Sequence, residues 1–145
     1  MAPVERSGKY AVPHTLHGGS QDVWIDHHFA DSSTLPVAVQ TWVLSPGAWE
    51  GMHAHEHPAL EELYIVIWGQ ARIVQQGNEH HLDAGDSLLS PVGTPHDLMN
   101  TGDGNLRILV IWGPPGSFDM SGFGSYRKAV QARSGVGFDD DQRRK

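Results

Sequence analysis

The chain has 145 residues, a length that accommodates one domain with a hydrophobic core. Its net charge of −7 and the lack of a Lys/Arg cluster before the last few residues argue against nucleic-acid or anionic-membrane partners. The absence of Cys excludes a disulfide framework, a thiolate metal site and a cysteine nucleophile. Without a signal-type apolar segment or a run of membrane-spanning length, we expect a cytoplasmic protein.

Short apolar runs separated by turn residues predict an all-β structure. Residues 1–22 are rich in Gly, Pro, Ser and His without an apolar period, and we expect an irregular N-terminal arm. The expected strands lie at residues 37–44, 63–68, 71–74, 87–89 and 106–112. Residues 75–79 are the expected tip of a hairpin. We expect one β-sandwich or small-barrel domain over residues 1–145, with an irregular C-terminal extension at 113–145.

A group of histidines marks the candidate site. His53, His55 and His57 occupy alternate positions, so on a strand they share one face. Neutral imidazole is the commonest metal-binding side chain, and two on one strand can chelate an ion from one side. His96 follows a turn rich in Pro and Gly, and Glu62 opens an expected strand. This constellation predicts a metal centre.

Two spaced motifs contain these residues. The first comprises Gly47-x5-His53-x-His55 and Glu62-x6-Gly69, and the second is Gly85-x5-Pro91-x-Gly93-x2-His96-x3-Asn100. They resemble the cupin superfamily motifs G-x5-H-x-H-x3–4-E-x6-G and G-x5-P-x-G-x2-H-x3-N. The resemblance covers about residues 37–112. It implies a jelly-roll type β-sandwich or small barrel in which motif His and Glu side chains converge on one metal ion.

The first motif departs from the family pattern in one place. Six residues separate His55 from Glu62, where the family has three or four. Taking His55 and His57 as the two motif histidines restores that spacing to Glu62, but it no longer fits the spacing from Gly47. A straight strand would put the α-carbons of His53 and His57 roughly 13 Å apart, whereas a bend before Pro58 would bring all three histidines in. We expect four ligands, His53, His55, His57 and His96, with Glu62 as an alternative ligand or an acid/base group.

The metal and the cavity wall are predicted from residue chemistry. An all-nitrogen site without thiolate favours Zn²⁺, with Fe²⁺ as the main alternative. The expected substrate pocket is apolar and rich in aromatic side chains; the alternative is that these residues form ordinary barrel core. The pocket residues are Trp42, Met52, Tyr64, Val66, Trp68, Leu98, Phe118 and Met120. Only Arg72 and Arg107 carry positive charge in the middle of the chain, which argues against a sugar-phosphate site.

The remaining histidines are expected on the surface. His80 and His81 follow the hairpin tip, and we expect both to be exposed. The same interpretation applies to His14, His17, His27 and His28, with the alternative that one of them reaches the pocket.

Within the cupins, the length and the His-Ala-His-Glu-His run are similar to small actinobacterial cupins that act as aromatic polyketide cyclases. This resemblance implies intramolecular aldol condensation of a poly-β-ketone with loss of water, at a redox-inert Zn²⁺ ion. A metal-bound hydroxide, Glu62 or a non-ligating histidine such as His57 would take the proton. The substrate would arrive free or on an acyl carrier protein, and the protein would be a homodimer. The alternatives are a non-haem iron dioxygenase and a non-catalytic ligand-binding cupin.

Overall fold

The computed structural model describes residues 3–116, 130 and 132. The chain divides into two units, Met1–Pro115 and Gly116–Lys145, and all the strands assigned in the described residues lie in the first. These are β1 (Ala11–His14), β2 (Val23–His27), β3 (Ala38–Leu44), β4 (Trp49–His53), β5 (Glu61–Trp68), β6 (Gln70–Gln75), β7 (Asn78–Asp83), β8 (Ser87–Ser90), β9 (His96–Asn100) and β10 (Leu106–Gly113). No helix within the described residues is long and apolar enough to cross a membrane.

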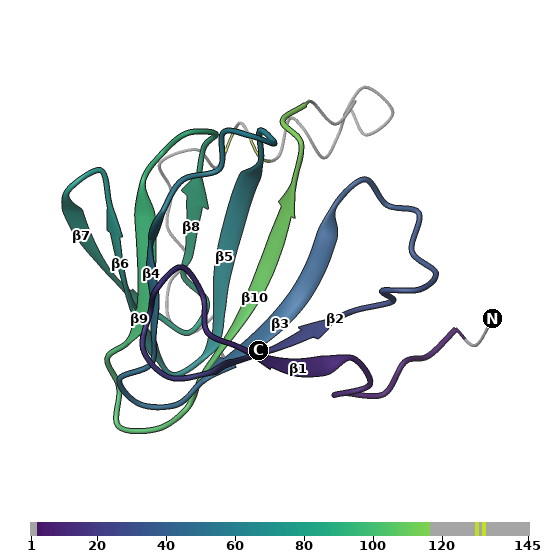
Figure 1. Cartoon of the computed structure of the whole chain (residues 1–145), viewed down its shortest axis with the longest axis horizontal. Helices are drawn as coiled ribbons and strands as arrows, with labels where there is room; N and C mark the ends of the chain where they lie inside the picture. The colour runs from purple at the N-terminus through teal and green to yellow at the C-terminus, as the bar shows by residue number, and fades with distance from the viewer. Residues whose placement is uncertain (1–2, 117–129, 131, 133–145) are drawn as a thin grey trace. The chain divides into compact units, whose positions relative to one another are not determined.

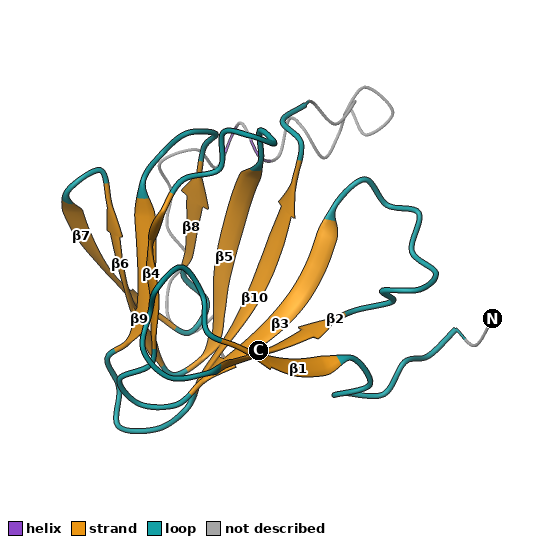
Figure 2. Ribbon diagram, in the orientation of Figure 1, coloured by secondary structure: helices purple, strands orange, loops and turns teal. Residues whose placement is uncertain are grey.

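Two antiparallel sheets make up this unit, which confirms the expected all-β class. One sheet has six strands in the order β1-β2-β3-β10-β5-β8, and the other has four in the order β4-β9-β6-β7 (Figures 1 and 2). Along β3, β5 and β10, every second side chain is buried, as a strand with one covered face requires. The inward-facing apolar core includes Trp42, Leu44, Tyr64, Val66, Ile108 and Val110.

The five expected strands are present, as β3, β5, β6, β8 and β10. The hairpin tip is also confirmed: Gln76 and Gly77 both have positive φ (49° and 79°), the geometry that suits a two-residue turn between twisted strands. Five further strands were not predicted. β7 shows why, because its sequence is Asn-Glu-His-His-Leu-Asp and only Leu82 is buried. Backbone pairing with β6 holds such a polar strand in place without an apolar pattern.

The expectation of an irregular N-terminal arm is corrected in part. Residues 11–14 form β1, which pairs with β2 at the edge of the six-stranded sheet. Residues 15–22, here called the strap, then cross to β4 at the edge of the other sheet (Figure 1). Ser20 and Trp49 exchange two backbone hydrogen bonds of 3.0 and 3.1 Å, and the Gly51 N–H donates to the Leu16 carbonyl at 3.1 Å. The strap therefore connects the two sheets beside the site.

Close approach of the strap depends on a missing side chain. A Cβ at Gly51 would lie 1.8 Å from the carbonyl oxygen of His17, a distance that no side chain tolerates.

The last residue of the second motif has a structural role. The Asn100 amide group donates to the carbonyls of Leu44 and Gly104, both at 2.9 Å, and its Oδ1 accepts from the Gly102 N–H at 2.9 Å. The side chain is buried, and these bonds join the end of β9 to β3 and to the following turn. This contact explains why the motif ends in Asn without giving it a place in the chemistry.

Candidate metal centre

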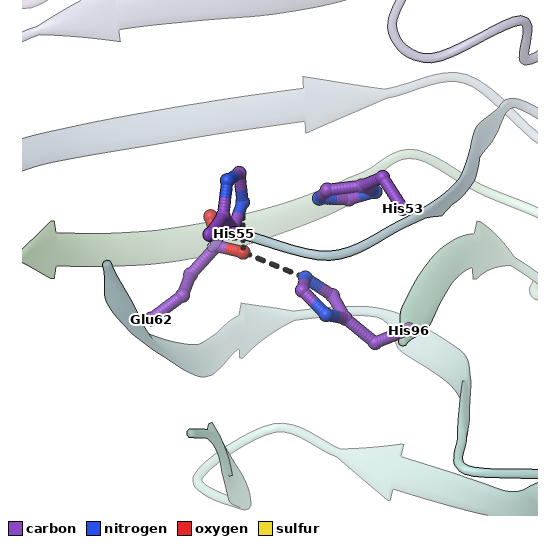
Figure 3. A group of neighbouring side chains, drawn as sticks. All are labelled: His53, His55, Glu62 and His96. Carbon is purple, nitrogen blue, oxygen red and sulfur yellow. Dashed lines mark hydrogen bonds and ion pairs between the residues drawn. The ribbon is translucent and has the colours of Figure 1, made fainter. Parts of the chain in front are cut away.

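Four side chains from three strands and one loop meet between the sheets. His53 ends β4, His55 lies just beyond it, Glu62 is near the start of β5, and His96 begins β9. One ligand atom from each lies within 4.8 Å of all the others (Figure 3). Metal–nitrogen bonds of about 2.1 Å place opposite ligands roughly 4 Å apart, so only a small contraction is needed to enclose an ion.

The tautomers of two histidines suit metal binding. His53 Nδ1 lies 2.8 Å from the Gly51 carbonyl oxygen, and His96 Nδ1 lies 2.9 Å from that of Thr94. A carbonyl can only accept, so each Nδ1 carries a proton and donates it. Each Nε2 is then the atom that can coordinate a cation once it carries no proton. His96 Nε2 points at Glu62 Oε1 at 2.8 Å, and His55 Nε2 lies 3.5 Å from the same oxygen. The residues present therefore fit a divalent metal ion.

Glu62 and His96 are hydrogen-bonded to each other without a metal, and this contact shifts the pKa values of both. Burial would raise the pKa of Glu62, but hydrogen bonds from His96 and Tyr64 outweigh it, and the pKa is lowered. Burial would lower the pKa of His96, but the hydrogen bond to Glu62 outweighs it, and the pKa is raised. In contrast, burial lowers the pKa of His53 to about 4, so His53 is neutral at pH 7. A cation binding here would displace the His96 proton.

A second carboxyl group, Glu50, lies next to the cluster and was not predicted. It is fully buried on β4, and its Oε1 lies 3.2 Å from His53 Nε2. The Tyr64 hydroxyl links the two carboxyl groups, at 2.7 Å from Glu62 and 3.1 Å from Glu50. Among the described residues, no hydrogen-bond partner reaches Glu50 Oε2. Burial, followed by the charge of Glu62, raises the pKa of Glu50 well above its usual value, which favours the protonated form of this carboxyl group.

The cluster opens into a cavity of about 260 Å³. Its wall combines the metal-site residues with apolar, aromatic and neutral polar side chains. The lining residues are His14, Leu16, His17, Ile25, Gln40, Trp42, Glu50, His53, His55, Leu60, Glu62 and Trp112. No Lys or Arg is among these described lining residues. The cavity therefore combines apolar and aromatic side chains with histidine and carboxyl groups.

The structure does not place His57 in the cluster. β4 ends at His53, and residues 55–60 form a turn closed by backbone hydrogen bonds from Leu60 and Gly93 to the His55 carbonyl. The alternation of a strand therefore stops before His57, whose side chain is exposed. The expected four-histidine site is replaced by three histidines and Glu62, and the extra residues between His55 and Glu62 form this turn.

The expected pocket residues have different locations. Trp42 lines the cavity. Tyr64, Val66 and Leu98 are buried in the core and do not line it, although the Tyr64 hydroxyl reaches the carboxyl groups. Met52 and Trp68 are exposed, at 47% and 69%. Phe118 and Met120 lie outside the described residues.

The exposure of Trp68 has a local cause. In the pairing of β10 with β5, Arg107 lies opposite Trp68 and the next residue, Ile108, lies opposite Val66. Ile67 therefore has no partner in the ladder and forms a bulge. This bulge breaks the alternation that would have placed Trp68 on the inward face with Glu62.

The strap brings a histidine into the site that the sequence patterns left on the surface. The His17 ring stacks on the His53 ring, with a centroid distance of 3.7 Å and an interplanar angle of 9°. His17 and His14 both line the cavity, as the alternative interpretation allowed. Trp112, Gln40 and Glu50 also line it and were not predicted. The available signal was that these residues occupy inward-facing positions on strands. The alternation of inward and outward side chains does not show whether an inward residue lines a cavity or packs in the core. His80 and His81 are exposed, as expected.

The fold and the site together define a β-sandwich protein with a candidate His₃Glu metal centre between its sheets. The family model of the Cupin domain (Cupin_2) matches residues 40–112, half of the chain. The chain belongs to the cupin family.

Curated relatives match part of the chain. The oxalate-binding protein of Thermotoga maritima is 31% identical over 68 residues, which cover 47% of this chain and 54% of the relative. The dimethylsulfoniopropionate lyase DddQ of Ruegeria pomeroyi is 37% identical over 59 residues, 40% of this chain and 28% of the relative. The chain thus spans about half or less of the length of these relatives.

Solved structures show the same fold. A predicted oxalate decarboxylase from Thermotoga maritima superposes with a TM-score of 0.70 at 24% identity, covering 77% of this chain and 99% of that one. A Cupin 2 conserved barrel domain protein from Salinispora arenicola gives 0.56 at 23% identity, covering 72% and 84%. At these identities the likeness concerns the fold alone.

Proposed function

We propose that this cupin is a metal-dependent cyclase that closes an aromatic ring of a poly-β-ketone by intramolecular aldol condensation. One observation carries the proposal. A His₃Glu cluster lies at a cavity that Trp42, Trp112 and Ile25 also line, without Lys or Arg among the described lining residues. The resemblance of the His-Ala-His-Glu-His run to aromatic polyketide cyclases supports the same reaction.

The charge of the cavity bears on the substrate. Two relatives are named for oxalate, a small dianion. In this chain, a dianion would find no Lys or Arg among the described lining residues, whereas Glu50 and Glu62 add carboxyl groups to the wall. A neutral polyketone with a flat, apolar part suits such a wall better, because its burial against indole rings releases water at no cost in unpaired charge.

The metal would be held by His53, His55, Glu62 and His96. A divalent ion held there would polarise a carbonyl group and stabilise the enolate formed next to another. We favour Zn²⁺, which performs no redox chemistry on the oxygen-sensitive product.

The protein groups supply orientation and proton transfer. The carbonyls of Gly51 and Thr94 hold the rings of His53 and His96 in one tautomer. Glu50 lines the cavity and has a carboxyl oxygen without a hydrogen-bond partner among the described residues, and we assign it the exchange of protons with the substrate. A CH₂ or CH₃ carbon loses one proton as it bonds to the carbonyl carbon and a second as that bond becomes double, and the carbonyl oxygen takes up two protons and leaves as water. No oxidant is consumed, and the wall of the cavity selects which carbons meet.

The test uses a synthetic phenyl-capped triketone, whose aldol closure with loss of water yields a phenyl-substituted resorcinol. We expect zinc-loaded protein to accelerate formation of the resorcinol, followed by its absorbance and by mass spectrometry. Glu50→Gln keeps the shape of the side chain and is expected to slow the reaction about 100-fold, within the usual contribution of a general acid or base. His81→Gln, an exposed histidine, is the matched control and should leave the rate unchanged.

Other outcomes would point elsewhere. Stoichiometric iron in protein purified without added metal, together with O₂ consumption in the presence of an aromatic substrate, would replace the cyclase with a dioxygenase. A protein that binds the triketone without converting it, with any metal, would be a ligand-binding cupin. Either result would end the cyclase proposal.

A further inference from the structure

Gln40 is held in one orientation by two tryptophans. It is an inward-facing residue of β3 and is 8% exposed. Its Oε1 accepts the indole N–H of Trp42 at 2.9 Å and that of Trp112, on the neighbouring strand β10, at 3.2 Å. An indole N–H can only donate, so the atom facing both rings must be the amide oxygen. These two bonds fix the direction of the whole carboxamide group.

The fixed amide leaves one polar group for a ligand. Gln40, Trp42 and Trp112 all line the cavity that contains His53, His55 and Glu62. Because Oε1 is occupied by the two indoles, the Nε2 group is what Gln40 can offer to a molecule in that cavity. An amide N–H₂ is a neutral donor, and it pairs with a carbonyl or phenolic oxygen.

We propose that Gln40 is a specificity-determining residue that donates a hydrogen bond to a carbonyl or phenol oxygen of a neutral, flat substrate lying against Trp42 and Trp112. The inference deepens the proposed function and rests on it for the class of substrate. The donor is preorganised, so binding a ligand oxygen costs little side-chain entropy. A substrate without that oxygen would leave the amide donor buried and unpaired, which is the basis of discrimination.

A matched pair of probes tests this role without relying on turnover. Acetophenone and ethylbenzene have similar shapes and differ in the carbonyl oxygen. Their affinities are measured by ligand-observed NMR on the full-length protein, first with metal removed by chelation and then with zinc restored. We expect the wild-type protein to prefer acetophenone by about three- to tenfold after metal removal, the range of one hydrogen bond.

Two variants separate a ligand contact from a structural role. Gln40→Met removes the donor and the acceptor, and Gln40→Glu keeps an oxygen for the indoles while losing the amide donor. In both, we expect the preference for acetophenone to fall to about one, while ethylbenzene affinity and zinc content stay unchanged. Circular dichroism checks that each variant is folded.

Several results would overturn the proposal. The first is a wild-type protein that binds neither probe or binds both with equal affinity. The second is a preference for acetophenone that persists in either folded variant. The third is an equal loss of affinity for both probes in the variants, which would indicate a purely structural role for Gln40. Because the deciding comparison is made after metal removal and does not require turnover, a protein that lacks cyclase activity can still pass or fail it.

Discussion

At the scale of single residues, the side chains that face the interior separate the candidate metal ligands from the other histidines. His55 lies in the cluster and His57, two positions later, is exposed. We expect His55→Gln to weaken zinc binding at least 100-fold, because a ligand is lost from a set of four, and His57→Gln to leave it unchanged. Competition with a chromogenic chelator gives both affinities. Equal losses in the two variants would restore the four-histidine site.

His53 also predicts a pH dependence of the metal-free protein. Its pKa is lowered by burial from 6.5 to about 4, so the unfolded chain binds a proton that the folded chain excludes. Stability is therefore lost as the pH falls below 6.5. Acidification to about pH 5 is expected to cost roughly 1.5 kcal/mol from this group.

The comparison with His53→Gln isolates that effect. Urea unfolding of the metal-free wild type and variant is measured at neutral pH and at about pH 5. The free energy of unfolding should fall less on acidification in the variant. The ion pair of His96 with Glu62 is retained in both proteins, so its own pH dependence cancels in the difference. Parallel losses in the two proteins would mean that His53 titrates normally in the fold.

At the scale of elements, the strap connects the sheets and positions His17 on His53. Gly51→Ala would force Cβ against the His17 carbonyl and displace the strap. We expect a loss of about 1–3 kcal/mol in unfolding free energy, and faster proteolysis within residues 15–22. Gly104→Ala is the control, since nothing lies within 4 Å of a Cβ there. Both are measured by urea unfolding and limited proteolysis; an unaffected strap in Gly51→Ala would show that its docking is not close.

At the scale of the whole molecule, the outward face of the six-stranded sheet supports the expected homodimer as a proposal. Apolar residues meet there in cross-strand pairs, Leu63 with Ile111 and Ile65 with Leu109, all half-buried. A continuous apolar sheet face is typical of a surface that another protein covers. We expect light scattering to give twice the mass of one chain.

A substitution on this face tests the dimer. Leu109→Lys places a charge at its centre and is expected to yield monomers, because burying an unpaired ammonium group costs more than the contact returns. Leu35→Lys, at an exposed loop position, should leave the mass unchanged. A monomeric wild type, or a dimer in both variants, would contradict this arrangement.

The sequence alone determined the parts of this protein that follow local chemical rules. Alternation of apolar residues marked the strands with one buried face, such as β3 and β10, and motif spacing identified His53, His55, Glu62 and His96 as candidates. Turn chemistry located the tip at Gln76 and Gly77. These features depend on neighbouring residues, so they can be predicted without knowing the fold.

Only the tertiary structure decided which candidates act together. The end of β4 at His53 excludes His57, and a bulge at Ile67 turns Trp68 outward; both depend on pairing with strands distant in sequence. His17 and Glu50 enter the site because the strap docks on β4 and because Tyr64 spans two carboxyl groups. Such contacts arise from packing between different strands and the strap, and no local pattern encodes them.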